Sequence, residues 1–225
     1  MAMVFAVFCV LGAFGAGNMF QANQMHAQIV NVTGGDASVL SGRGWLTGLI
    51  MATFVFMVIV GGITSIARFA EKIVPLMAAI YCGAALIIIL THIDRVPWAF
   101  GQIVSGAFTG AGIAGGALGA LIQGFRRAAF SNEAGFGSAS IAHSAVRTNE
   151  PITEGLVALL EPFIDTVIIC TMTALVVVLT GVLQFDPQTG LYVWNAELGR
   201  IATTGNATGV ELTSTAFATE FSWFP

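Results

Sequence analysis

Residues 130–147, FSNEAGFGSASIAHSAVR, place polar side chains between two long apolar runs. They include the carboxylate of Glu133 and the amide of Asn132. Their hydroxyls come from Ser131, Ser138, Ser140 and Ser144. Lipid can neither hydrogen-bond a free backbone group nor solvate a carboxylate. Such a segment at membrane depth must face protein or a water-filled cavity, which indicates a solute pathway.

The glycines of this segment suggest which solute it accepts. Gly135 and Gly137 permit irregular backbone, and an unwound helix exposes N–H groups, carbonyls and half-helix ends. Half-helix N-termini attract a carboxylate, while freed carbonyls suit a cation or an ammonium group. An amino acid presents both groups, so the pattern fits a zwitterion without a dedicated charged side chain.

Glu133 needs a partner, because a carboxylate at a helix centre costs about 2.5–3.5 kcal/mol on insertion scales. The nearest cations in the sequence are Arg126 and Arg127, about two turns earlier. Two interpretations stay open: a structural ion pair that pins a broken helix, or a pair that gates or lines the pathway.

The first apolar run also carries amides. Asn18, Gln21 and Gln24 are three residues apart, so α-helical spacing places them on one face. A buried amide in a helix bundle contributes about 0.6–2 kcal/mol to helix association. Gln21 is therefore expected either to hold helices together or to contact a solute.

Glu161 and Asp165 form a second pair of carboxylates, four residues apart in the last apolar run. Pro162 between them removes one N–H and frees a carbonyl one turn earlier. One interpretation is a helix start near the membrane interface with solvated carboxylates. The other is a role for Asp165 in gating or in coupling to an ion.

The composition predicts an integral membrane protein. The chain is 56% hydrophobic and 9% charged, with a mean hydropathy of +0.86, whereas a soluble domain is about 25% charged. No HExxH, P-loop or zinc-spaced Cys/His pattern is present, so we expect no enzyme and no cofactor. GFGSAS with His143 resembles a serine–histidine dyad only faintly, because the spacing along one helix is too short. No basic cluster suggests a nucleic acid partner.

Charge-free windows of about 20 residues mark the expected spans. The expected fold is an all-α integral membrane domain, incomplete and multi-pass in the plasma or inner membrane. Its predicted spans are 3–26, 45–66, 73–93, 112–147 (broken) and 155–183, followed by a polar extramembrane loop over 184–220. Gly61 and Gly62 are expected to mark a close helix contact, and the three cysteines to be free thiols.

Four long motifs resemble the sodium:alanine symporter family, the alanine or glycine:cation symporters. They are GNMFQANQ (17–24), GGITSIARFAEKIVPLMAAIY (61–81), FSNEAGFGSASIAHSAVRT (130–148) and EGLVALLEPFIDTVIICTMTAL (154–175). They occur in the family's order and cover nearly the whole chain.

The resemblance implies a carrier with two inverted five-helix repeats and broken first and sixth helices. This chain resembles the third to seventh helices, so the family's first, second and eighth helices, with the ion site, are expected on other sequence. The resemblance implies that Gln21 donates to the substrate carboxylate and that Phe130 caps a short side chain. Ser131, Asn132 and Gly135 would supply unwound backbone beside them.

The sequence therefore predicts symport of a small neutral amino acid, alanine or glycine, with sodium or possibly protons. The alternative is a channel, or a structural membrane subunit without coupled transport. A channel is expected to carry rings of charge or a carbonyl filter, whereas here only Glu133 and Asp165 stand isolated in apolar runs.

Overall fold

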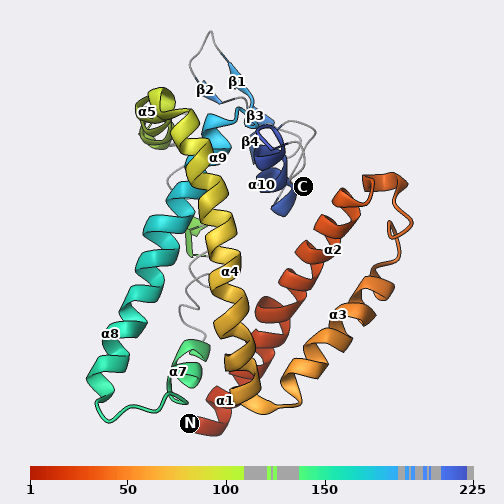
Figure 1. Cartoon of the computed structure of the whole chain (residues 1–225), viewed down its shortest axis with the longest axis vertical. Helices are drawn as coiled ribbons and strands as arrows, with labels where there is room; N and C mark the ends of the chain where they lie inside the picture. Colours follow the sequence, from red (N-terminus) through yellow and green to blue (C-terminus); the bar gives the residue numbers. More distant parts are fainter. Residues whose placement is uncertain are drawn as a thin grey trace. The chain divides into compact units, whose positions relative to one another are not determined.

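The computed structural model describes residues 1–108, 121–122, 124–125, 137–186, 191–192, 194–195, 200–201, 203 and 209–221. These residues are predominantly helical, as predicted (Figure 1). The helices before residue 109 are α1 (Ala2–Gly12), η1 (Ala13–Met19), α2 (Phe20–Val32), η2 (Gly35–Ala37), α3 (Gly44–Ile59), α4 (Gly62–Thr91), η3 (Ile93–Arg95) and α5 (Val96–Phe108). Those after it are α7 (Ser138–His143), α8 (Pro151–Pro162), η4 (Phe163–Ile169), α9 (Cys170–Leu179) and α10 (Val210–Ala218).

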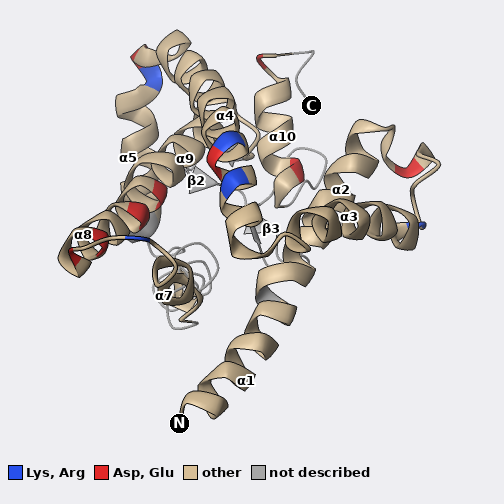
Figure 2. Cartoon of the chain, turned by 60° about the horizontal axis from the view of Figure 1, so that its bottom comes forward, with Lys and Arg blue, Asp and Glu red and all other residues tan. Residues whose placement is uncertain are grey.

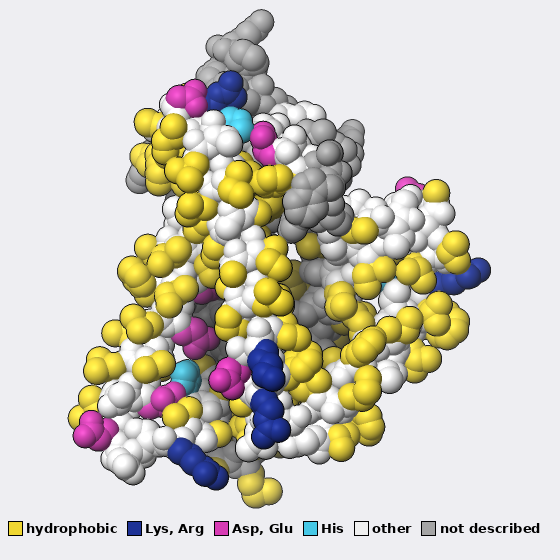
Figure 3. All heavy atoms as spheres, viewed as in Figure 1, with side chains coloured by type: hydrophobic (Ala, Val, Ile, Leu, Met, Phe, Trp, Pro, Cys, Tyr) yellow, Lys and Arg dark blue, Asp and Glu magenta, His cyan; other side chains and the backbone are white. Residues whose placement is uncertain are grey.

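Three helices are long and apolar enough to cross a membrane. They run over Ala2–Val32, Gly62–Thr91 and Pro151–Leu179, and the shorter helix Gly44–Ile59 is also apolar. Large side chains stay exposed on them, for example Phe8, Phe54 and Leu159. Figure 3 shows hydrophobic side chains over most of α3 and α4. Soluble monomers rarely expose such continuous apolar surface, so these helices identify a membrane protein.

The described residues fall into two compact units. One comprises Met1–Ile80 and Ala129–Pro162, and the other comprises Tyr81–Ala128 and Phe163–Pro225. The first contains α1 to α3, the beginning of α4, α7 and α8. The second contains the rest of α4, α5, η4, α9, four two-residue strands and α10.

In the first unit, a polar contact joins α2 to α3. The Thr47 hydroxyl donates to the Gly44 carbonyl at 3.0 Å, so its lone pair accepts the Nδ1–H of His26 at 2.8 Å. Thr47 is buried, so this contact satisfies a hydroxyl away from solvent. It explains why His26 lies near the end of an apolar helix.

A sharp turn separates α3 from α4. Gly62 adopts φ +73°, a left-handed conformation that an L-residue adopts only at a cost. The expectation of a close helix contact at Gly61 and Gly62 was therefore wrong, because Gly61 lies in the turn between the two helices and Gly62 is the first residue of α4. The helix that follows also differs from the predicted spans 45–66 and 73–93, since α4 starts at Gly62 and continues through Pro75.

Arg68, Glu71 and Lys72 lie inside α4 rather than between two helices. Spacings of three and four residues place them on one helix face. Figure 2 shows basic and acidic residues next to each other on α4. The helix thus continues through a charged stretch that suggested a loop, with the opposite charges of Arg68 and Glu71 three residues apart on one face.

The core of the second unit consists of α4, α9 and α10. Ile88, Val176, Val182 and Phe217 are its largest fully buried side chains. The Tyr81 ring lies 5.4 Å from the Phe217 ring, centroid to centroid. The polar loop predicted over 184–220 thus contains a packed helix, because Ala216 and Phe217 bury an apolar face that the polar composition of the segment conceals.

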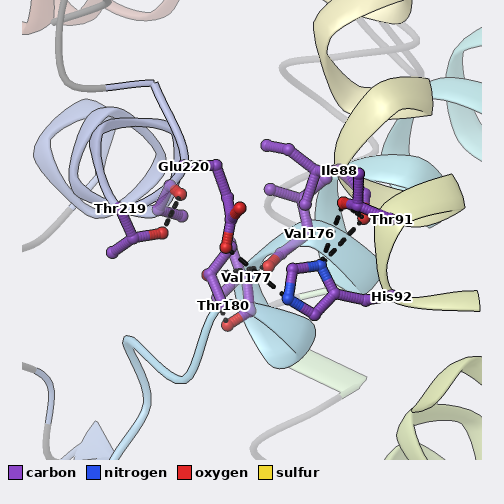
Figure 4. Close-up of polar contacts among 9 residues, drawn as sticks. Ile88, Thr91, His92, Val176, Val177, Thr180, Thr219 and Glu220 are labelled. Carbon is purple, nitrogen blue, oxygen red and sulfur yellow. Dashed lines mark hydrogen bonds and ion pairs between the residues drawn. The ribbon is translucent and has the colours of Figure 1, made fainter. Parts of the chain in front are cut away.

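Polar contacts border this core (Figure 4). His92 Nδ1 donates to the Ile88 carbonyl at 3.1 Å, and its Nε2 lies 3.6 Å from Glu220 Oε1. The Thr173 hydroxyl donates to the Ile169 carbonyl at 2.8 Å and accepts the Tyr81 hydroxyl. These contacts fix α4 against α9 and the end of α10.

Short strands precede α10. β1 (Phe185–Asp186) pairs antiparallel with β2 (Leu191–Tyr192), and β3 (Trp194–Asn195) pairs with β4 (Arg200–Ile201). Each strand has only two residues, so among the described residues the helices carry the packing.

Gly62→Ala should destabilise the protein by about 1–2 kcal/mol, because only the left-handed backbone penalises the new methyl group. The free energy of unfolding in mixed detergent micelles measures this loss. Gly83→Ala is the matched control, since Gly83 lies inside α4 with open space around its Cβ position. It should be neutral or stabilising by up to about 1 kcal/mol. Equal effects of the two substitutions would contradict the assigned turn.

Candidate functional site

Two of the three long apolar helices contain a π-helical segment where polar residues lie. η1 includes Gly15, Gly17 and Asn18, and η4 includes Asp165. A π segment hydrogen-bonds i to i+5, so it bulges without leaving the backbone unsatisfied, and such segments are frequent at functional sites. Pro162 directly precedes η4 and lacks the N–H that a regular turn needs. The proline and the glycines are evident in the sequence, but the π geometry was not predicted from them.

Gln21 lies on α2, two residues after η1 ends, and its side chain is exposed. Gln21 and Gln24 share one face of this α-helix, as predicted from their spacing. Asn18 belongs to η1, where the wider turn no longer follows α-helical spacing. The predicted row of three amides therefore holds for the two glutamines only.

Asp165 is half-buried within η4, one turn after Glu161. The spacing in the sequence suggested that these two carboxylates form a pair. Glu161 belongs to the compact unit that contains α7 and α8, whereas Asp165 belongs to the other unit. Glu161 contacts His143 of its own unit. The structure thus assigns Glu161 a partner that sequence spacing did not indicate.

Most of the predicted substrate and gating residues lie outside the described residues. These are Arg126, Arg127, Phe130, Ser131, Asn132, Glu133 and Gly135. Gly137, the next described residue, has φ +76° and is the N-cap of α7. Irregular backbone at Gly137, one of the two glycines that suggested it, is confirmed.

Gly137 also permits a close approach within its unit. A Cβ atom at this position would lie 2.6 Å from Cζ of Phe5 on α1, well inside van der Waals contact. Glycine thus satisfies two requirements here, a left-handed turn and an aromatic ring against the backbone.

A pocket of about 620 Å³ lies between α7 and α8. Its polar lining comes from Ser140, His143, Ser144, Thr148, Glu154 and Glu161. Nδ1 of His143 lies 2.6 Å from Oε1 of Glu154, and Nε2 lies 3.5 Å from Oε2 of Glu161. Figure 2 shows several acidic residues along α8. A mainly apolar pocket with His143, Glu154 and Glu161 in its wall thus opens beside α8.

This histidine cluster was missed from the sequence, where His143 was considered only as a dyad partner for serine. Glu154 and Glu161 are seven residues apart, about two turns, so they share a face of α8. That spacing was available, whereas the fold of residues 144–150, which brings α7 back to α8, was not. Within the described part of the chain, no group of three His, Cys, Asp or Glu side chains forms a metal site.

Gly137→Ala should cost about 2–4 kcal/mol, because backbone strain adds to overlap with the Phe5 ring. The free energy of unfolding should fall further than for Gly62→Ala, where the substitution causes backbone strain alone. In the double variant with Phe5→Ala, the part of this loss that comes from steric overlap should be recovered. The part that comes from backbone strain should remain. If Phe5→Ala recovers nothing in this double-mutant cycle, the contact does not constrain the turn.

Comparison with known proteins shows which family and which relatives the chain resembles. The model of the sodium:alanine symporter family matches residues 1–225. A sodium/alanine symporter, AgcS, of Methanococcus maripaludis is 39% identical over 190 residues, 84% of this chain and 40% of the relative. A probable sodium/glutamine symporter, GlnT, of Bacillus subtilis is 35% identical over 199 residues, 88% of this chain and 40% of the relative.

A further relative is a sodium/proton-dependent alanine carrier protein of Bacillus sp. strain PS3. It is 36% identical over 137 residues, which cover 60% of this chain and 31% of the relative. The chain thus spans less than half the length of these three relatives.

Proposed function

The chain belongs to the sodium:alanine symporter family, and on that premise we propose that it forms part of a carrier that moves a small neutral amino acid with sodium across the cell membrane. The observation that carries the proposal is the family match over residues 1–225. The family is one of transporters, so the proposed activity is transport and not an enzymatic reaction.

Alanine or glycine is the proposed solute. Two of the relatives are named for alanine and one for glutamine, while all three are named for sodium. Sodium coupling is therefore the more general feature, and a proton is the proposed alternative because one relative is named for both cations. A short side chain is favoured by the resemblance of Phe130 to the family's capping aromatic.

The proposed substrate contacts are Gln21, Phe130, Ser131, Asn132 and Gly135. The exposed side chain of Gln21, close to a π segment in an apolar helix, supports its part in this set. An amide N–H held there donates to a carboxylate without introducing charge into the membrane.

The proposed gating or ion-pair residues are Glu133, Arg126, Arg127 and Asp165. Asp165 lies in η4, whose wider turn changes the direction in which the helix presents side chains. A carboxylate within an apolar helix is costly, so a functional role is the default hypothesis for it.

Alanine uptake by vesicles containing the full protein should collapse when choline replaces external sodium, because the coupling ion then no longer drives entry. The measurement is the initial rate of radiolabelled alanine uptake at fixed membrane potential. Uptake that persists without sodium but requires a proton gradient would favour proton coupling. Current without any amino acid would favour the channel and contradict symport.

Gln21→Ala should reduce alanine transport about tenfold or more, because a hydrogen bond to a charged group contributes about 1.5–3 kcal/mol. Gln24→Ala is the matched control on the same helix face, and it should have a small effect. The ratio of transport efficiencies, corrected for the amount of protein in the membrane, separates the two. Equal losses of transport for the two variants would indicate that Gln21 packs helices together and does not contact the substrate.

A further inference from the structure

The contacts of His143 connect two helices through one ring. His143 is the last residue of α7, and Glu154 and Glu161 lie on one face of α8. Each ring nitrogen faces a different carboxylate, Nδ1 at 2.6 Å from Glu154 and Nε2 at 3.5 Å from Glu161. The ring therefore spans about two turns of α8.

The protonation state of the His143 ring determines how many of these two contacts are attractive. An ionised carboxylate only accepts hydrogen bonds, and a neutral imidazole has a single N–H. Neutral His143 would thus turn a lone pair toward one of the two carboxylates. The imidazolium ion donates from both nitrogens, and it alone matches both partners.

From this geometry we propose that His143 is a proton-binding site that fastens α7 to α8 when its ring is doubly protonated. The bound ligand is a proton, held by Glu154 and Glu161 from the side of α8. Releasing that proton removes the attraction to at least one carboxylate and loosens α7. The proposal concerns this contact and does not depend on which solute the carrier moves.

Distance ranks the two partners. Nδ1 lies 2.6 Å from Glu154, whereas Nε2 lies 3.5 Å from Glu161. Electrostatic attraction weakens with distance, so Glu154 is the principal partner and Glu161 the weaker one. The side chains of His143 and Glu154 are partly exposed, and both line the pocket between α7 and α8.

Other charged groups near the ring are few. On α7 the pocket is lined by Ala139, Ser140 and His143, and on α8 its ionisable residues are Glu154 and Glu161 alone. Arg147 and Glu150, between the helices, do not line the pocket. Among the described residues the local charge balance is thus one histidine against two carboxylates.

The short length of α7 makes it sensitive to this contact. A helix of six residues is not stable by itself in water, so contacts outside the helix must hold it. At one end it has the Gly137 turn against Phe5, and at the other it has His143 on α8. Loss of the second contact leaves α7 fixed at one end only.

The test is a pH titration of the full protein in nanodiscs with 15N-labelled imidazole rings, observed by NMR. A blocked histidine peptide in the same buffer is the reference, because its ring has no carboxylate partner. His143, which faces Glu154 and Glu161, should keep both protons at a pH at which the ring of the peptide has become neutral. Glu154→Gln should move the titration of His143 to lower pH, and Glu161→Gln should do so by a smaller amount. A His143 ring that titrates with the peptide, or whose titration Glu154→Gln leaves unchanged, would overturn the proposal.

Amide hydrogen exchange of α7 provides the second readout. Protection of α7, corrected for intrinsic exchange, should fall as His143 loses its proton. His143→Gln should lower protection at every pH, whereas His143→Lys, a cation throughout this range, should keep it at every pH. Protection of α7 that follows pH equally in all three proteins would mean that His143 does not fasten the helix.

Discussion

Backbone hydrogen bonding in lipid is the constraint on which this structure depends. Each N–H or C=O without a partner in the hydrocarbon costs several kilocalories per mole, so an apolar span must remain hydrogen-bonded along its whole length. This explains why Ala2–Val32 and Pro151–Leu179 stay continuous through glycines, a proline and polar residues. The π segments η1 and η4 are the form that irregularity takes under this constraint. They change the direction in which side chains point within helices that stay continuous.

The same constraint separates two uses of glycine in the chain. Within η1 the glycines belong to a continuous helix, whereas Gly62 and Gly137 adopt left-handed conformations where α4 and α7 begin. A left-handed residue ends a helix sharply, so these positions fix where a helix begins. α7 starts at such a point and is too short to persist without contacts at both ends.

Much of the helical architecture was predictable, because runs of apolar residues and their flanking charges are properties of the sequence itself. Irregular backbone at Gly137 followed from the glycine, whereas the start of α7 directly after it was not predicted. The π geometry of η4 did not, because Pro162 shows that a bond is lost but not which register replaces it. α10 escaped prediction, since its polar composition outweighed the few apolar residues that dock on α4 and α9. The partners of His143 depend on how the segment after α7 folds back, which local patterns do not encode.

The charged row of α4 has a mechanical consequence. A helix of 30 residues is about 45 Å long, some 15 Å more than the hydrocarbon layer. Arg68, Glu71 and Lys72 all fall within its first eleven residues, so the surplus length emerges at that end. We therefore expect the initial turns of α4 to extend into the headgroup region, where guanidinium and ammonium groups attract lipid phosphates. Such an extension would set the depth of α4 in the bilayer and keep the turn at Gly62 outside the hydrocarbon.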